Sequence, residues 1–483
     1  MTRELRQITR ALLALFAVTA LAAAYWGVWR SGALLAREDN ARNVLRERHI
    51  QRGAIYDRDG ALLAESVPDA NGFMQRRYPD PSVSGAVGYY SFTYGTAGIE
   101  AAFDAELRGD LWLDDWDRFL LGLLHRAQRG GDVRATLDLD VQRAASDALG
   151  GRSGAVVLLD VPSGAVLALV SQPNYDPNTL DAHWDALTAD LEASPLLNRA
   201  VAGLYQPGGT LETAILAAWL REFPDLADGG AALLEAPVPQ ATAPVRVNGL
   251  TLHCLGTTPA KPMTLLDAYA WVCPAPFARA FEGDLLTPQR FWELLGTLGL
   301  LDPPQLAGFE TAASPSAHPL SAHTPPDELT AELVGQGSLT VTPLHMAQLA
   351  AAIANRGNGV PVHLADAVRP PSAETWQPLD IPAQQPALLR PDVAEALRRA
   401  MRATAERNPA LARAKVDGMT LYGHLAPAYA GPDATPYAWF VGFAEYTDAD
   451  GAPHTVALAV LVENEAHVSV AAEVAAAALR ALQ

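Results

Sequence analysis

An uncharged apolar run near the N-terminus constrains this chain more than any other feature. Residues 11–29 read ALLALFAVTALAAAYWGVW and contain no charged side chain. About 20 apolar residues in a helix span the hydrocarbon core of a bilayer, so the run is long enough to cross a membrane. Three arginines precede it, and the positive-inside rule then places the N-terminus in the cytoplasm. These are Arg3, Arg6 and Arg10.

A cleaved signal peptide is the alternative interpretation of this run. The run is longer than the usual apolar core of a signal peptide, and Trp26, Trp29 and Arg30 follow it without a clear small-residue cleavage site. We therefore expect residues 1–30 to be a cytoplasmic tail and a retained anchor, with Tyr25, Trp26 and Trp29 at the outer interface. The chain is then a single-pass protein of the cell membrane, and its bulk is extracytoplasmic.

Composition excludes several kinds of partner. The net charge is −19, which disfavours a nucleic-acid partner because phosphate binding needs basic patches. The two cysteines, Cys254 and Cys273, lack a second ligand in a zinc spacing, so we expect no metal and no cofactor.

Residues 204–220, LYQPGGTLETAILAAWL, predict a turn that leads into a buried helix. Pro207, Gly208 and Gly209 interrupt regular structure. From Leu211 onward apolar residues recur at intervals of three and four, which is typical of one buried helix face.

Three segments together resemble class B penicillin-binding proteins, particularly the short actinobacterial-type members of this peptidoglycan D,D-transpeptidase family. They are the turn and helix at 204–220, QRGAIYDRDG at 51–60, and the two stretches GYYS and YGTAGIE within 88–100. The resemblance covers nearly the whole chain. It implies a small β-rich pedestal, non-catalytic and dimerisation-like, at 31–135 and a penicillin-binding transpeptidase-like domain at 136–483.

The pattern of elements predicts an α+β fold with a central antiparallel sheet flanked by helices. Residues 154–171 form two β-rich runs joined at Pro162-Ser163-Gly164, and further strands are expected at 438–445 and 455–463. A helix beginning after Thr342 should end near Gly357.

Further helix limits follow from the same signals. Asp140 is the expected N-cap of a helix over 141–149, and an alanine-rich helix should begin near Val470. The Pro- and Ala-rich stretch at 370–385 is expected to be a surface loop.

The catalytic helix of the family begins with a Ser-x-x-Lys pair. The matching positions here hold Gly209 and Glu212. Gly209 has no side chain that could attack a substrate, and Glu212 places an acid where the family has a cationic base. Thr210 is a weak alternative nucleophile, because its offset turns it about 100° from the face of position 209. A capping role for Thr210 is the simpler interpretation.

The other two family motifs are also degenerate. Val272 and Pro274 match the serine and asparagine of Ser-x-Asn, and neither can relay a proton or donate an amide hydrogen bond. For Lys-Thr-Gly, the closest match places Met419 at the lysine, Thr420 at the threonine and Leu421 at the glycine. We therefore expect no catalytic residues and no acyl-enzyme.

Cysteine and histidine residues near these motifs leave alternatives open. Outside the cytoplasm, Cys254 and Cys273 could form a disulfide or remain as two buried thiols. His424 follows the third motif and could line the cleft or be an ordinary strand residue, and His253 is expected at the surface.

The leading functional hypothesis is a membrane-anchored pseudoenzyme of cell-wall synthesis. The resemblance implies a place in the machinery of cell shape or cell division, with a partner such as a membrane glycan polymerase and possibly a peptidoglycan stem peptide in the cleft. One alternative is an active D,D-transpeptidase that binds penicillin with a non-standard nucleophile. Another is an extracytoplasmic sensor of muropeptides or β-lactams.

Overall fold

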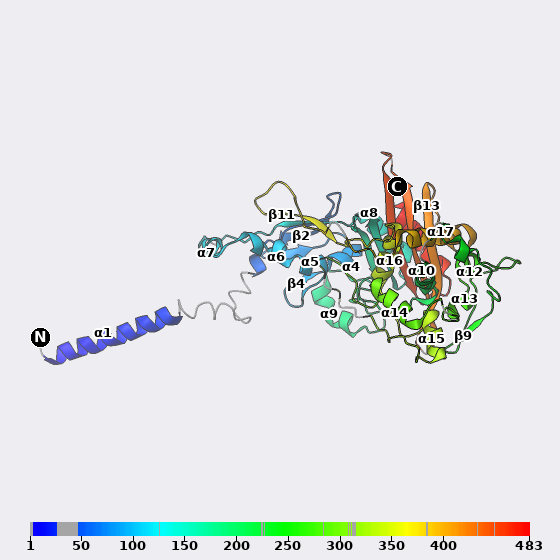
Figure 1. The fold of residues 1–483 in the computed structure, drawn as a ribbon. Helices are drawn as coiled ribbons and strands as arrows, with labels where there is room; N and C mark the ends of the chain where they lie inside the picture. The colour runs from blue at the N-terminus through cyan, green and yellow to red at the C-terminus, as the bar shows by residue number, and fades with distance from the viewer. Residues whose placement is uncertain are drawn as a thin grey trace.

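The fold was determined as a computed structural model. It describes residues 3–26, 47–124, 126–223, 226, 228–283, 285–307, 309, 311, 315–382, 385–431, 433–448 and 450–483. Helix α1, Arg3–Ala24, projects away from the rest of the chain (Figure 1). Its residues 6–24 are long and apolar enough to cross a membrane, and their side chains are not buried by the protein. Tyr25 and Trp26 follow directly, whereas Trp29 lies outside the described residues.

The pedestal is built on a six-stranded sheet with the order β12-β11-β6-β1-β2-β3. Four strands come from the predicted pedestal: β1 Ile55–Tyr56, β2 Leu62–Pro68, β3 Met74–Arg77 and β6 Asp132–Ala135. The other two, β11 Ala365–Arg369 and β12 Gln377–Pro378, come from far along the chain. Part of the stretch predicted as a surface loop is therefore an edge strand of the pedestal sheet.

Short helices cover the pedestal and extend its tip. They are α4 Ser84–Val87, α5 Gly98–Ala102, α6 Asp104–Arg108 and α7 Asp115–Leu123. Helix α7 lies at the end of the pedestal farthest from the C-terminal domain (Figure 1).

A buried ion network holds α5 against this sheet. The Glu100 carboxylate is fully buried and accepts hydrogen bonds from Arg52 Nη2 at 2.9 Å and Arg76 Nε at 2.5 Å. Arg52 also contacts Asp104, whose side chain is 41% exposed, at 2.5 Å. Burial opposes ionisation of Glu100, but the two guanidinium groups outweigh it and lower the pKa of this carboxyl below its ordinary value.

The C-terminal domain is organised around a five-stranded antiparallel sheet with the order β13-β14-β15-β7-β8. The strands are β7 Gly154–Val161, β8 Val166–Gln172, β13 Met419–Ala430, β14 Thr435–Thr447 and β15 Pro453–Glu463. Strand β13 is an edge strand, and its pairing with β14 runs without a break from Met419 to Ala430. The predicted α+β fold with a central antiparallel sheet flanked by helices is confirmed.

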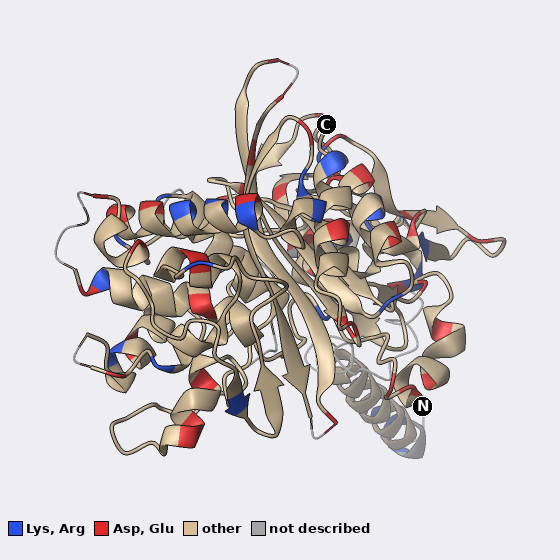
Figure 2. Ribbon diagram, turned by 90° about the vertical axis from the view of Figure 1, so that its right-hand side faces the viewer, with Lys and Arg blue, Asp and Glu red and all other residues tan. Residues whose placement is uncertain are grey.

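Each face of this sheet buries its own hydrophobic core. Helices α8 Leu139–Leu149 and α18 Ser469–Arg480 cover one face. The other face packs against α10 Glu212–Arg221, α16 Pro343–Ala354 and α17 Pro391–Arg407. Acidic and basic side chains are interspersed over the surrounding helices, and the strands between them carry few charges (Figure 2).

Two predicted helix starts can be compared with the observed caps. Thr342 caps α16 as expected, with Pro343 at the first helical position. The predicted N-cap Asp140 is wrong, because Asp138 accepts the backbone N–H groups of residues 140 and 141 and α8 begins two residues earlier. Asp138 has the extended backbone that an N-cap needs.

Candidate functional site

Four of the degenerate positions line one cavity of about 240 Å³. They are Gly209, Glu212, Val272 and Pro274. Gly209 lies in a short 3-10 turn, η4 Gly208–Leu211, and Glu212 begins α10. Val272 follows α12 Leu265–Ala270, and Pro274 begins α13 Pro274–Ala278. The first two predicted motifs therefore meet in space, although about 60 residues separate them in the chain.

The space for a nucleophile at position 209 is already filled. A β-carbon added to Gly209 would lie 2.9 Å from Ala426 Cβ and 2.9 Å from Val272 Cγ1. Carbon atoms in favourable contact are about 3.5–4.0 Å apart. The site has therefore repacked around the glycine, so that a serine at this position would collide with its neighbours.

We expect the single change Gly209→Ser to destabilise the protein without restoring acylation. Overpacking a filled core costs about 1–3 kcal/mol, and denaturant unfolding measures this loss. In an Ala426→Gly background one of the two close contacts is gone, so the cost of Gly209→Ser should fall. Equal costs in both backgrounds would show that Ala426 does not occupy the space of the serine side chain.

The backbone beside Gly209 also depends on glycine. Gly208 has a φ of +55°, and a β-carbon there would lie 2.3 Å from the Pro427 carbonyl oxygen. The Gly208 N–H donates to the Gly335 carbonyl at 2.9 Å. Close approach to two backbone segments requires glycine at this position. The turn that leads into α10 therefore depends on Gly208 as well as on Gly209.

Glu212, which lines the cavity, forms a buried pair with His424. Glu212 Oε2 lies 3.4 Å from His424 Nε2, and both side chains are at most 3% exposed. His424 Nε2 donates to the Gly209 carbonyl at 3.2 Å, and the ring stacks on Tyr269 with centroids 4.2 Å apart. Glu212 Oε2 and His424 Nδ1 have no hydrogen-bond partner in the described part of the chain.

Burial disfavours the charged form of both members of this pair. It raises the pKa of the Glu212 carboxyl well above its ordinary value. It lowers the pKa of His424 to about 3. A carboxyl cannot supply the positive charge of a lysine in either protonation state, and the imidazole with its pKa of about 3 is uncharged at pH 7. None of the described residues that line the cavity is Lys or Arg, so a ligand carboxylate would find no counter-charge there.

The prediction for the third motif requires correction. Met419, Thr420 and Leu421 pair with residues 444–446 at the far end of β13. The strand segment beside Gly209 instead contains His424 and Ala426. At about 3.4 Å per residue, the error of five positions corresponds to about 17 Å along the strand.

The structure thus places His424 and Ala426, and not Met419 or Leu421, beside Gly209. The error arose because β13 and β14 form a tight hairpin, with residues 431–434 between the strands, and not a long loop. Counting back from the predicted strand at 438–445 with a short turn would have found this register.

Pro427 removes a hydrogen-bond donor from the cleft edge of β13. Its carbonyl oxygen points towards Gly208, so its nitrogen lies on the same edge. Proline has no N–H. Two positions on, the Tyr429 N–H is already engaged by Gln336 Oε1 at 3.2 Å. Acyl transfer requires N–H donors aimed at the developing oxyanion, and neither Pro427 nor Tyr429 offers a free one.

Thr210 does not supply the missing nucleophile. Its side chain is 1% exposed and donates its hydroxyl to the Pro207 carbonyl at 2.5 Å. The prediction that it caps the helix is wrong, because α10 has Leu211 at its N-cap and no side-chain cap. The hydroxyl is therefore committed to the turn and turned away from a substrate.

A disulfide joins Cys254 to Cys273, the residue between the two degenerate positions of the second motif. Cys254 follows a β-hairpin, β9 Val245–Val247 and β10 Leu250–Leu252, so the bond ties this hairpin to the cleft. Of the two possibilities left open by the sequence, the disulfide is the observed one. His253, beside it, is exposed and lines the mouth of the cavity.

We expect replacement of both cysteines by serine to destabilise the protein by about 3 kcal/mol. The bond closes a loop of 19 residues, and this value follows from the lost constraint on the unfolded chain. Denaturant unfolding with and without a reductant measures this contribution of the disulfide to the free energy of unfolding. The double variant is the control, because the reductant should leave its stability unchanged. A wild-type protein that is also insensitive to the reductant would contradict the prediction.

Comparisons with known proteins agree on a single family. The model of the penicillin binding protein transpeptidase domain matches residues 154–222 and 310–480, and that of the penicillin binding protein A dimerisation domain matches residues 52–133. The chain is 31% identical to the peptidoglycan D,D-transpeptidase PbpA of Mycolicibacterium smegmatis, over 96% of this chain and 94% of that protein. For PbpA of Mycobacterium tuberculosis the identity is 32% with the same coverage.

Solved structures give the same result. The ceftriaxone acyl-enzyme complex of penicillin-binding protein A from M. tuberculosis matches with a TM-score of 0.75 and 29% identity, over 91% of this chain and all of that chain. A D,D-transpeptidase domain from Eggerthella lenta matches with a TM-score of 0.74 and 25% identity, over 90% of this chain and 98% of that chain.

Proposed function

The chain belongs to the class B penicillin-binding proteins of peptidoglycan synthesis, and from this membership we propose that it is a membrane-anchored member that does not acylate. The observation that carries the proposal is the packing of Val272 and Ala426 into the space of a nucleophilic side chain at Gly209. A lost side chain alone would leave a vacant site. Neighbouring side chains that fill the space of the nucleophile indicate that this part of the cleft has taken on a structural role.

Three further losses support the same proposal. We assign the two lysine positions of the family to 212 and 424, which here hold a buried carboxyl and a buried imidazole whose charged forms burial disfavours. The strand edge beside Gly209 has a proline in place of a donor. Nucleophile, base, carboxylate recognition and oxyanion stabilisation are therefore all missing from one cleft. An alternative nucleophile would have to act without any of them.

The role left to such a protein is binding. We place the partner, a membrane-embedded protein of cell-wall synthesis such as a glycan polymerase, at the tip of the pedestal. Leu111, Trp116 and Leu123 around α7 are 62–66% exposed, and contiguous exposed apolar side chains mark interaction sites. This tip is at the end of the pedestal that lies towards α1 (Figure 1), and the apolar α1 would anchor the chain with its bulk outside the cytoplasm.

Co-purification from membranes tests this role. The full-length chain, captured from detergent-solubilised membranes of its own organism, should retain a membrane enzyme of peptidoglycan synthesis identified by mass spectrometry. The variant Leu123→Asp should lose that protein. The matched control is Leu191→Asp, because Leu191 is 84% exposed but lies beyond α9 Leu180–Ala189 in the C-terminal domain. Equal retention by both variants, or no such enzyme in any capture, would overturn the assignment.

A further inference from the structure

We propose that the cavity at Gly209 binds a small organic cation, a primary ammonium with an apolar body, on the carboxylate of Glu212. The cavity has a volume of about 240 Å³. Cavities that hold drug-sized ligands measure about 300–1,000 Å³, so this one suits a smaller molecule. The inference goes beyond the proposed function, because it concerns reversible binding, which is measured without penicillin and does not depend on whether the chain acylates.

Glu212 presents one carboxyl oxygen to this cavity. Among the described residues of the lining it is the one acidic side chain, and Lys and Arg are absent. Oε2 is enclosed, lies 3.4 Å from His424 Nε2 and has no hydrogen-bond partner in the described part of the chain. The 3% of the side chain that is exposed therefore lies on the side of Oε1. Oε1 is 3.9 Å from a β-carbon built on Gly209, so it can accept an N–H group from a ligand in the cavity.

The described neighbours of Glu212 supply no positive charge to its carboxyl. The imidazole of His424 has a pKa of about 3 and is uncharged at pH 7, and burial raises the pKa of the Tyr269 phenol, which is also neutral. Burial thus raises the pKa of Glu212 well above its ordinary value. A cation at Oε1 favours the ionised carboxyl and lowers this pKa. Its binding should therefore release a proton and strengthen as pH rises towards the folded pKa of Glu212.

Apolar side chains form most of the wall around Glu212. They are Leu252, Leu255, Val272, Phe277, Val334 and Val468. Val272 has a φ of +50°, which is rare for a β-branched residue, and the disulfide from the adjacent Cys273 to Cys254 ties this segment in place. An inorganic cation would not cover this apolar surface, whereas an organic cation would remove it from water. The wall therefore favours a cation with an apolar body.

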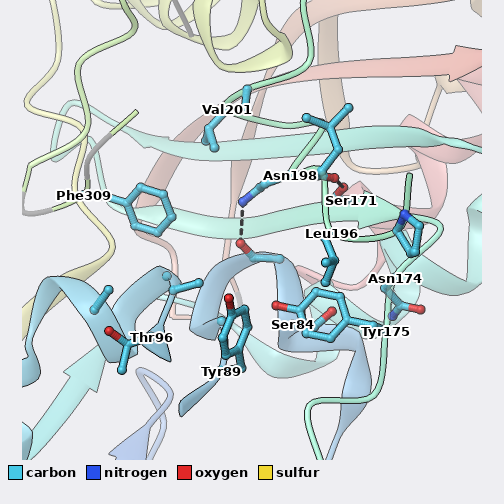
Figure 3. A pocket seen from close by; sticks show the side chains of 18 of the residues that line it. Ser84, Tyr89, Thr96, Ser171, Asn174, Tyr175, Leu196, Asn198, Val201 and Phe309 are labelled. Atoms are coloured by element: carbon cyan, nitrogen blue, oxygen red, sulfur yellow. Dashed lines mark hydrogen bonds between the residues drawn. The ribbon is translucent and has the colours of Figure 1, made fainter. Parts of the chain in front are cut away.

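A second, larger cavity lacks such a counter-charge. It has a volume of about 990 Å³ and lies between the pedestal and the C-terminal domain, where Tyr89 and Tyr175 line it (Figure 3). None of the described residues that line it is acidic or basic. A cation that entered it would lose its water without gaining an opposite charge. Of these two cavities the one at Glu212 suits a cation, and Tyr175 provides a control position outside it.

Calorimetric titration of the full-length chain in nanodiscs of zwitterionic lipid tests the proposal, with empty nanodiscs as the blank. The probes are benzylammonium, benzyl alcohol and benzoate, which share one ring and differ in charge. We expect saturable binding of benzylammonium. The other two should bind at least about tenfold more weakly, because neither forms a cation–carboxylate hydrogen bond. Equal or tighter binding of benzyl alcohol or benzoate, or no saturable binding of benzylammonium, would overturn the proposal.

The pH dependence of binding identifies the group that holds the cation. A primary ammonium stays charged between about pH 5 and 8, so a change of affinity in this range comes from the protein. Wild-type affinity should rise with pH, and titrations in two buffers of different ionisation enthalpy should show proton release.

Glu212→Gln should bind benzylammonium at least about tenfold more weakly and lose the proton release. This variant retains the other ionisable side chains of the lining, His253 and Tyr429, so any pH dependence that they cause remains in it. A wild-type affinity that does not change with pH, or the same pH dependence in Glu212→Gln, would refute the role of Glu212.

Further variants locate the site. Ala466 is exposed at the rim of this cavity, and Ala466→Trp should weaken benzylammonium binding several-fold by narrowing the entrance. It also serves as the test if Glu212→Gln does not fold. Two controls should leave the affinity unchanged: Tyr175→Phe in the larger cavity, and Glu395→Gln, which removes a carboxylate that is 71% exposed. Unchanged affinity in Ala466→Trp, or a loss in either control, would place the cation elsewhere and overturn the proposal.

Discussion

Replacing Glu100 by glutamine should reduce the stability of the pedestal by about 3–5 kcal/mol. The change preserves the shape of the side chain but removes the charge that two buried guanidinium groups share. Breaking a buried ion pair by removing one partner leaves an uncompensated charge, which is the cause of this large cost. Hydrogen exchange of peptides from residues 52–108 measures this loss of stability within the pedestal.

Asp104→Asn provides the matched control for this change. Asp104 contacts the same Arg52, but its side chain is 41% exposed, and solvent-exposed ion pairs contribute about 0–1 kcal/mol. The network also implies a pH effect. Glu100 has a folded pKa below its ordinary value, so its contribution is present above the unfolded pKa and is lost on acidification. Equal losses in Glu100→Gln and Asp104→Asn would contradict this account of the network.

Replacing Glu212 by glutamine should instead stabilise the protein, and increasingly so at higher pH. Burial raises the pKa of the Glu212 carboxyl in the folded state, whereas the unfolded chain releases the proton at its ordinary pKa of about 4.3. A carboxyl with a raised folded pKa therefore loses stability as pH rises, at about 1.4 kcal/mol per pH unit until the folded pKa is reached. Glutamine has no proton to release and avoids this loss.

Denaturant unfolding from pH 5 upward measures the Glu212 effect as the difference between the pH profiles of Glu212→Gln and the wild type. His424 has a folded pKa of about 3, so its linkage reduces stability only as pH falls below the ordinary value of about 6.5. It therefore contributes no slope above pH 7. The control Glu395→Gln changes an exposed helix carboxylate, 71% exposed, and should leave the pH profile unchanged. Parallel profiles for Glu212→Gln and the wild type would show that Glu212 is ionised in the folded state.

Local sequence signals predicted much of the fold. The β7–β8 hairpin followed from Pro162-Ser163-Gly164, and α16 followed from its cap at Thr342. These elements depend on neighbouring residues, whose turn and capping preferences are local. The pairing of β11 with β6 was missed because it joins residues more than 200 positions apart. Pairing partners at such separation leave no local signature.

The difference between local signals and long-range contacts also separates the predicted from the unpredicted parts of the cleft. Gly209, Glu212, Val272 and Pro274 were found because each lies next to a helix start or end with a recognisable pattern. His424 was not assigned, because the third motif was matched five residues too early in β13. Its contact with Glu212 joins residues on two elements, and only the assembled fold brings them together.

Exposure to penicillin tests the central claim most directly. The purified full-length chain is incubated with a fluorescent penicillin and its intact mass is measured, beside M. tuberculosis penicillin-binding protein A, whose structure has been solved as a penicillin G acyl-enzyme. The repacked cleft predicts no mass shift for this chain and a covalent adduct for its relative. An adduct on this chain would contradict the account, and peptide mapping of the modified residue would identify the nucleophile.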